Sequence, residues 1–226
     1  MIHLDLNDET VFDYLKNISQ SILFRDVVSL FEVRNVDFLV RLVKYLANET
    51  GNVISARSIE NFLKSQNISI SITAILNYLN YLTTAMLISN VQRIDIQGKK
   101  VFQIGEKYYF NDIGLRNSIS GFSPFDMGQI IENAVFLHLK TIGYKLHVGK
   151  QNGTEIDFIG ERKGEKIYIQ VALRIVGKPT MEREFGNLLA IKDNYPKYVI
   201  TLDDYSGASY EGILHIPLKT FLTKFI

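Results

Sequence analysis

Apolar residues in the first 90 positions recur every three or four residues, a spacing typical of amphipathic helices. The pattern predicts a helical segment over residues 9–30 and three further helices, over 38–48 with Asp37 as N-cap, from Ser55, and over 71–87. Alternating residues then predict strands over 88–96 and 99–104 around Gln97-Gly98, followed by Tyr108-Tyr-Phe. Three helices followed by a hairpin predict a winged helix-turn-helix.

The second half of the chain centres on residues 154–174, where two alternating runs flank a turn at Gly164. This pattern predicts a β-hairpin. Because side chains alternate between the faces of a strand, Glu155 and Asp157 share one face of the first strand, and Gln170 and Ala172 share one face of the second. The hairpin therefore presents two carboxylates on one side.

Flanking segments complete an α/β core. The pattern predicts a helix, three strands, a helix and a strand, over 126–142, 144–150, the hairpin, 181–193 and 198–202. A short strand over 213–216 and a last helix through Phe225 follow. The fold class is α/β, or α+β overall: a winged helix followed by a mixed sheet flanked by helices.

The composition of the chain limits the kinds of binding site and partner that it can have. The chain has no cysteine, which excludes disulfides and cysteine zinc sites. The first nine residues lack a signal-peptide pattern, and no run of roughly 20 apolar residues occurs. We therefore expect a soluble, cytoplasmic protein without a membrane partner. The net charge of +1 makes any nucleic-acid binding depend on a local patch.

The winged helix offers few phosphate contacts. No Lys or Arg lies between Ser65 and Gln92, so the third helix carries none of the charge that most DNA affinity requires. Arg93, Lys99 and Lys100 on the predicted wing are the candidate nucleic-acid residues. This distribution favours protein packing over DNA binding for the module.

Glu132 falls on the apolar stripe of the helix over 126–142, together with Val135, Phe136 and Leu139. A carboxylate on such a stripe is costly unless it has a partner. Two interpretations stay open: Glu132 bonds backbone donors as a structural anchor, or it turns toward Asp157 as an accessory metal ligand.

Four motifs together resemble a known family, and they lie in order along about 200 residues. They are Phe24-Arg-Asp-Val-Val, Tyr108-Tyr-Phe-Asn-Asp-Ile-Gly-Leu-Arg-Asn, Gly128-Gln-Ile-Ile-Glu-Asn-Ala-Val-Phe, and Glu155-Ile-Asp-Phe followed by Ile169-Gln-Val. The chain resembles the C-terminal half of a family of prokaryotic AAA-type ATPases. The resemblance implies a winged helix over 36–120, a PD-(D/E)XK nuclease-like domain of restriction-endonuclease type over 121–226, and a segment over 1–35 that links to, or remains from, an upstream ATPase domain.

The resemblance also implies a site. Glu132, Asp157 and Gln170 fall on the family's acidic helix residue, core Asp and Glu/Gln, which would hold one Mg²⁺ for catalysis. Ala172 stands where the family usually has Lys, so the amine that orients water is missing. By strand alternation Arg174 is the better replacement cation, and Lys166 lies at the other end of the strand.

These observations leave three hypotheses. The first is an accessory region of an AAA-type ATPase whose degenerate nuclease-like domain binds protein or DNA; the chain has no phosphate-binding Gly-Lys-Ser/Thr loop of its own. The second is a Mg²⁺-dependent DNA nuclease with a relocated cation. The third is a DNA-binding module without cleavage. The sequence alone does not decide whether the chain is an enzyme.

Overall fold

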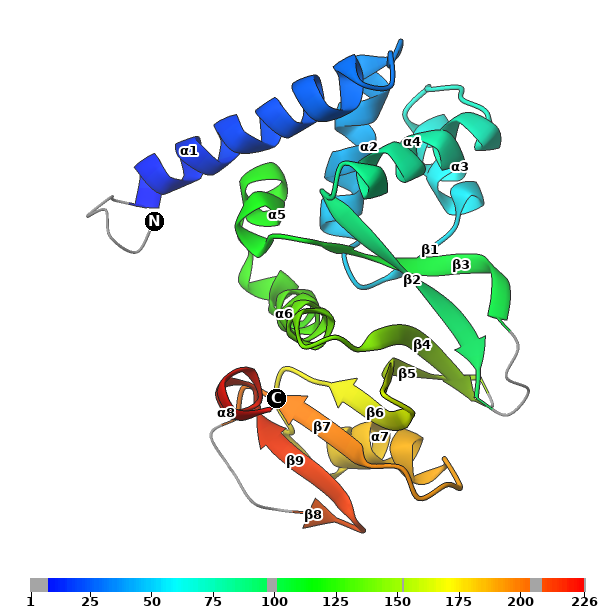
Figure 1. Ribbon diagram of the computed structural model, residues 1–226, viewed down its shortest axis with the longest axis vertical. Coiled ribbons are helices and arrows are strands. Elements are labelled where there is room, and N and C mark those ends of the chain that lie inside the picture. Colours follow the sequence, from blue (N-terminus) through cyan, green and yellow to red (C-terminus); the bar gives the residue numbers. More distant parts are fainter. Residues whose placement is uncertain (1–7, 97–100, 152, 204–208, 226) are drawn as a thin grey trace. The chain divides into compact units, whose positions relative to one another are not determined.

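The computed structural model describes residues 8–96, 101–151, 153–203 and 209–225, which form a mixed α/β fold (Figure 1). Its larger helices are α1 (Asp8–Ser21), the π-helix η1 (Ile22–Ser29), α2 (Val36–Asn48), α3 (Ala56–Ser65), α4 (Ile72–Thr84), α5 (Ile113–Ser120), α6 (Met127–Thr141), α7 (Gly177–Leu189) and α8 (Leu218–Lys224). Its strands are β1 (Val53–Ile54), β2 (Ile88–Asp95), β3 (Val101–Phe110), β4 (Lys145–Gln151), β5 (Thr154–Arg162), β6 (Glu165–Val171), β7 (Lys197–Thr201), β8 (Ser209–Tyr210) and β9 (Ile213–Pro217).

Two compact units divide the chain. The first combines Met1–Asn90 with Tyr108–Pro124, and the second combines Val91–Lys107 with Phe125–Ile226. Strands β2 and β3 each have residues in both units. The nine strands form a mixed sheet in the order β1-β3-β2-β4-β5-β6-β7-β9-β8.

The first unit is built on the predicted helices. The stripe of α2 is buried as expected, with Leu39, Leu42 and Leu46 fully inside. The predicted N-cap of α2 was wrong: the Asn35 side chain accepts from the Phe38 N–H at 3.0 Å. Asp37 lies in the first turn instead, where it pairs with Arg41.

Two further caps fix the ends of helices in this unit. Ser55 begins α3 in a capping box with Ser58, as the sequence indicated. Asp112 caps α5, a helix that the sequence had indicated only as a junction. A tertiary contact joins α5 to α2: Arg116 is 1% exposed and donates to the Ala47 carbonyl near the end of α2.

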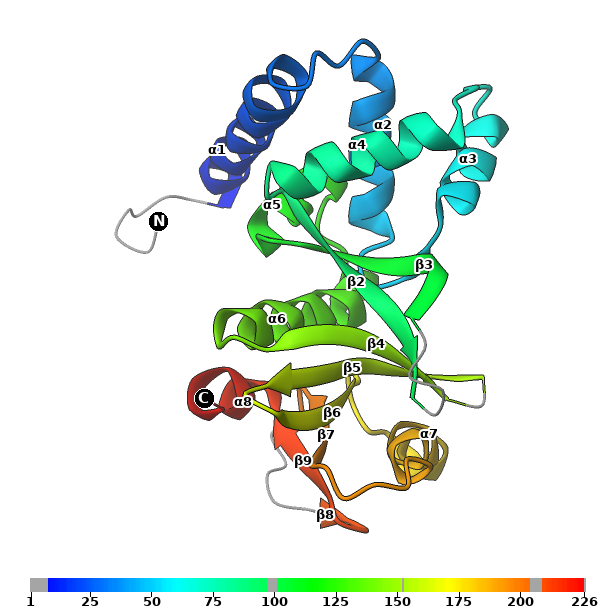
Figure 2. The ribbon, with the colours of Figure 1, turned by 45° about the vertical axis from the view of Figure 1, so that its right-hand side comes forward.

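The second unit contains the predicted hairpin. Strands β5 and β6 pair antiparallel, with Phe158 opposite Ile169. Strand β4 pairs antiparallel with β5, whereas β7 pairs parallel with β6 (Figure 2). The expected order of helix, three strands, helix and strand is confirmed by α6, β4, β5, β6, α7 and β7.

Helices cover both faces of this part of the sheet. On β7, Tyr198 packs against Phe225 beyond α8, while the next residue, Val199, joins a core cluster with Phe185 and Leu188 of α7. Because successive strand residues point to opposite faces, α7 and α8 lie on different sides. Helix α6 shares the α8 side, since His138 contacts Phe221.

A β-bulge interrupts the hairpin's first strand. His147 pairs with Ile159 and Gly149 pairs with Ile156, so an advance of three residues along β5 lies opposite an advance of two along β4. Ile156 and Ile159 consequently both join the core cluster with α7, while Phe158 contacts Phe136 of α6. The extra residue falls in the interval that contains Asp157, and bulges of this kind re-aim side chains beside functional sites.

The bulge gives a stability prediction at Gly149. A Cβ there would lie 2.9 Å from Ile159 Cδ1 and 3.0 Å from Ile156 Cβ. We expect Gly149→Ala to reduce the free energy of unfolding by about 1–3 kcal/mol through overcrowding, as measured by urea denaturation. Gly186→Ala is the matched control, because open space surrounds that position in α7 and alanine there should stabilise by up to about 1 kcal/mol. Equal behaviour of the two variants would contradict the packing at Gly149.

Candidate functional site

A buried lysine lies at the centre of the candidate site. Lys107 Nζ is 2.7 Å from Glu155 Oε1, 2.9 Å from Glu132 Oε1 and 3.3 Å from Asp157 Oδ1. All four residues belong to the second unit. The Lys107 side chain is only 3% exposed, so its three N–H donors meet three carboxylates away from bulk water. We call these four residues the Lys107 cluster.

Three different elements supply the Lys107 cluster. Strand β3 carries Lys107, helix α6 carries Glu132, and β5 carries both Glu155 and Asp157. The alternation rule placed the two β5 carboxylates on one face, and both reach the same ammonium. Glu132 forms an ion pair with Lys107, the same lysine that contacts Asp157.

The second oxygen of Asp157 is also engaged. Asp157 Oδ2 accepts a hydrogen bond from the Val171 N–H at 2.8 Å, which ties β5 to the last residue of β6. The carboxylate thus spans an ammonium and a backbone amide while the residue is 6% exposed. Its orientation is fixed by contacts on both sides.

Charge compensation decides the protonation of Lys107. Burial alone disfavours the ammonium, but the charges of Asp157, Glu132 and Glu155 outweigh it and raise the pKa of Lys107 well above its ordinary value. Burial raises the pKa of Asp157, an effect that Lys107 and the Val171 N–H oppose. We take the ammonium as the fixed charge, because three carboxylates surround it. With all carboxylates ionised, the cluster carries a formal charge of minus two.

The other predicted site residues lie at the end of β6. Gln170 precedes Val171, is 8% exposed, and its Oε1 is buried without a hydrogen-bond partner among the described residues. Ala172 is buried directly after the strand. Arg174 is exposed and lies beyond the end of β6 at Val171. The amine that contacts Asp157 in the structure is that of Lys107.

The predicted nucleic-acid residues are only partly described. Arg93 is half-buried on β2, where it pairs with Val148 of β4. Lys99 and Lys100 lie outside the described residues.

Across the described ranges, no group of three His, Asp or Glu side chains is arranged to hold a metal ion by itself. In the same part of the chain, no helix combines the length and apolar character needed to cross a bilayer.

Sequence reasoning missed Lys107. The prediction ended a strand at residue 104 and assigned no element to Lys107, whereas β3 continues through Gly105 to Phe110. An unbroken strand would have placed Lys107 on the same face as Tyr109, which is fully buried. A lysine on a buried face requires a partner, and that was the available signal.

Removing the ammonium tests the cluster. We expect Lys107→Met to reduce the free energy of unfolding at neutral pH by about 3–5 kcal/mol, because three carboxylates lose their counter-charge. The loss should shrink near about pH 4, where carboxylates take up protons. Urea denaturation at both pH values measures it. Lys166→Met is the matched control: its pair with Glu161 is more exposed and should be worth at most about 1 kcal/mol. Equal losses would contradict the cluster's role.

Comparisons with known proteins place the chain in a family. It is 35% identical to an uncharacterized protein of Haemophilus influenzae over 199 residues, covering 88% of this chain and 49% of that protein. It is 33% identical to an uncharacterized protein of Methanocaldococcus jannaschii over 210 residues, covering 88% and 46%. The chain thus spans about half the length of these curated relatives.

A match to the solved structure of protein VC1899 from Vibrio cholerae covers 96% of this chain and 55% of the VC1899 chain, at 11% identity. Its TM-score of 0.27 is too low to support an argument about fold or function. The family profile described as "Domain of unknown function (DUF8612)" matches residues 2–126. Because this match spans more than half of the chain, the chain belongs to the DUF8612 family.

Proposed function

We propose that the second unit is a PD-(D/E)XK nuclease-like domain that hydrolyses phosphodiester bonds with a divalent metal ion, and that Lys107 supplies the amine missing at Ala172. The single observation that carries the proposal is the contact of Lys107 with Asp157 and Glu132. The order of α6, β4–β6, α7 and β7 supports the fold assignment. The absent motif lysine was the main reason to expect a degenerate site, and a lysine from another strand removes that reason.

The residues present fit a hard divalent cation. Asp157, Glu132 and Gln170 offer oxygen donors, which Mg²⁺ prefers. The buried Gln170 Oε1 has no partner among the described residues, and such an atom is costly unless something binds it. The formal charge of minus two on the Lys107 cluster matches the charge of such an ion. A bound Mg²⁺ would polarise a phosphate and lower the pKa of a water molecule.

Lys107 acts as a fixed positive charge in this proposal. Since its pKa is raised, it stays protonated and cannot serve as a general base. It instead holds the Asp157 and Glu132 carboxylates in place and orients a phosphate oxygen or water through an N–H. Its donors all meet carboxylates, so one must be released for the substrate. Glu155 is the partner that gives way, because its side chain is 37% exposed while those of Asp157 and Glu132 are 9% and 14% exposed.

Metal binding and cleavage test the proposal together. We expect Mg²⁺ or Mn²⁺ to raise the melting temperature and to support nicking of single-stranded, duplex or branched DNA. Asp157→Asn should abolish the thermal shift and slow cleavage by at least about 100-fold, and chelation should do the same to the wild type.

The isosteric change Asp157→Asn preserves the shape of the side chain, and Lys107→Arg provides a second variant that keeps the charge. Asp13→Asn, at an exposed position of α1, is the matched control and should behave as wild type. The proposal fails if neither metal shifts the melting temperature, or if Asp157→Asn cleaves at the wild-type rate.

A second candidate function is an interaction region that serves a larger ATPase. Two observations favour it: the Lys107 cluster is internally satisfied, and the chain covers only 49% and 46% of its two relatives. In this case residues 36–120, which contain α2, β1, α3, α4, β2 and β3, are a winged helix that packs against protein. This function would be favoured over the first if neither the wild type nor the Asp157→Asn variant cleaves DNA and both bind a protein partner.

A further inference from the structure

A cavity at the β5–β6 turn has the charge of an anion-binding site. It has a volume of about 340 Å³ and is lined by Lys145, residues 161–166 and Tyr195. Four of its lining residues are basic and two are acidic: Lys145, Arg162, Lys163 and Lys166 against Glu161 and Glu165. We call it the turn cavity. A neighbouring cavity near Leu188 has Asp193 and Glu211 against Lys197, so it does not share this positive excess.

Strand register explains the excess. Glu161 pairs with Lys145 on β4 and with Lys166 on β6, so one carboxylate faces a lysine on each side. Its ion pair is with Lys166, at 3.2 Å. Arg162 is engaged elsewhere, by the Ile142 carbonyl and the Tyr144 ring. The exposed Lys145 and Lys163 are therefore the residues best placed to contact an anion.

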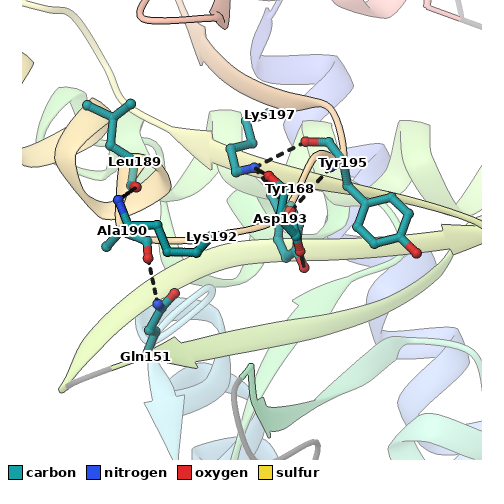
Figure 3. Close-up of polar contacts among 8 residues, drawn as sticks. All are labelled: Gln151, Tyr168, Leu189, Ala190, Lys192, Asp193, Tyr195 and Lys197. Carbon is teal, nitrogen blue, oxygen red and sulfur yellow. Dashed lines mark hydrogen bonds and ion pairs between the residues drawn. The ribbon is translucent and has the colours of Figure 1, made fainter.

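A rigid loop presents an aromatic ring to the same cavity. Lys197 Nζ donates to the Asp193 carbonyl at 2.7 Å, to Asp193 Oδ1 at 3.1 Å and to the Tyr195 carbonyl at 3.3 Å. The Tyr168 hydroxyl donates to Asp193 Oδ2 at 2.6 Å. These contacts hold the turn between α7 and β7, and the Tyr195 ring projects away from them (Figure 3).

Tyr195 is exposed although its loop is fixed. The residue is 45% exposed, and Lys166 Nζ lies 5.7 Å from its ring centroid. A partly buried polar network thus holds an exposed aromatic ring beside a group of cations. Positive charge combined with a stacking ring is the arrangement by which proteins bind unpaired nucleotides.

We propose that the turn cavity binds a single strand of nucleic acid, with phosphates at Lys145 and Lys163 and one base stacked on Tyr195. An unpaired strand suits this surface because the base faces of a duplex are covered by their neighbours. Arg162 is five residues from Asp157 along β5, about 17 Å of strand. The inference rests on the proposed nuclease function and assigns its substrate class.

Binding can be measured without cleavage. Fluorescence anisotropy of a labelled oligothymidylate, with the full chain in chelator, should give an affinity that falls as salt rises. Tyr195→Ala should weaken binding by about 5- to 150-fold, whereas Tyr195→Phe, which keeps the ring, should bind as wild type. Lys163→Gln should reduce the slope of log affinity against log salt by about 0.7. Lys219→Gln, at an exposed position of α8, is the control and should leave affinity and slope unchanged.

The outcomes separate this inference from the nuclease proposal. Unchanged affinity in Tyr195→Ala, or equal affinity for the same sequence as a blunt duplex, would overturn the inference even if Asp157-dependent cleavage is found. A mononucleotide that binds as tightly as the oligonucleotide would also overturn it, because a small-molecule pocket and not a strand would then be present. Tyr195-dependent binding of single strands without cleavage would sustain the inference and count against the nuclease.

Discussion

The second unit depends on one buried ammonium. Taking ionisable groups such as Lys107 and Asp157 out of water is costly, and close contacts between opposite charges offset that cost. Lys107 provides them at 2.7–3.3 Å to three carboxylates. The contacts join β3, α6 and β5, and Asp157 extends them to β6 through the Val171 N–H. One side chain thus links a helix and strands that backbone pairing of β5 with β4 and β6 also holds together.

The same geometry shapes the chemistry of the site. A preorganised charge costs no reorganisation when a substrate arrives. An ammonium whose three N–H donors all contact carboxylates must, however, release one of them first. Glu155 sits at the exposed side of the Lys107 cluster, and Asp157 is held from two directions. Displacement of the Glu155 carboxylate would expose one N–H of Lys107 and leave its contacts with Asp157 and Glu132 in place. In the proposed nuclease, the closed cluster and an open catalytic state would differ by the movement of one side chain.

The hairpin links this site to the turn cavity. Strand β5 carries Asp157 within its bulge and Arg162 at its end. Asp157, within the bulge, belongs to the Lys107 cluster, while ordinary pairing beyond the bulge places Glu161 between Lys145 and Lys166. The loop before β7 then adds Tyr195, held by Lys197 and Asp193. Two chemically different surfaces arise along one strand because its register changes partway.

Local patterns in the sequence determined most of the elements. Period-two alternation predicted the β5–β6 hairpin and the shared face of Glu155 and Asp157, because strand geometry depends on nearest neighbours. Helical spacing predicted the buried stripe of α2, and Ser55 marked the start of α3. Signals of this kind require no knowledge of distant residues.

Tertiary structure alone decided the site. Lys107 and Asp157 are 50 positions apart, and no local pattern reports that a lysine on one strand will meet carboxylates from another strand and a helix. Arg174 lies beyond the end of β6 at Val171, and Asn35 caps α2 in place of Asp37 because the helix begins at Val36, two residues before the predicted start. Burial of charge depends on partners that long-range packing brings together, so the sequence could indicate the carboxylates but not the ammonium between them.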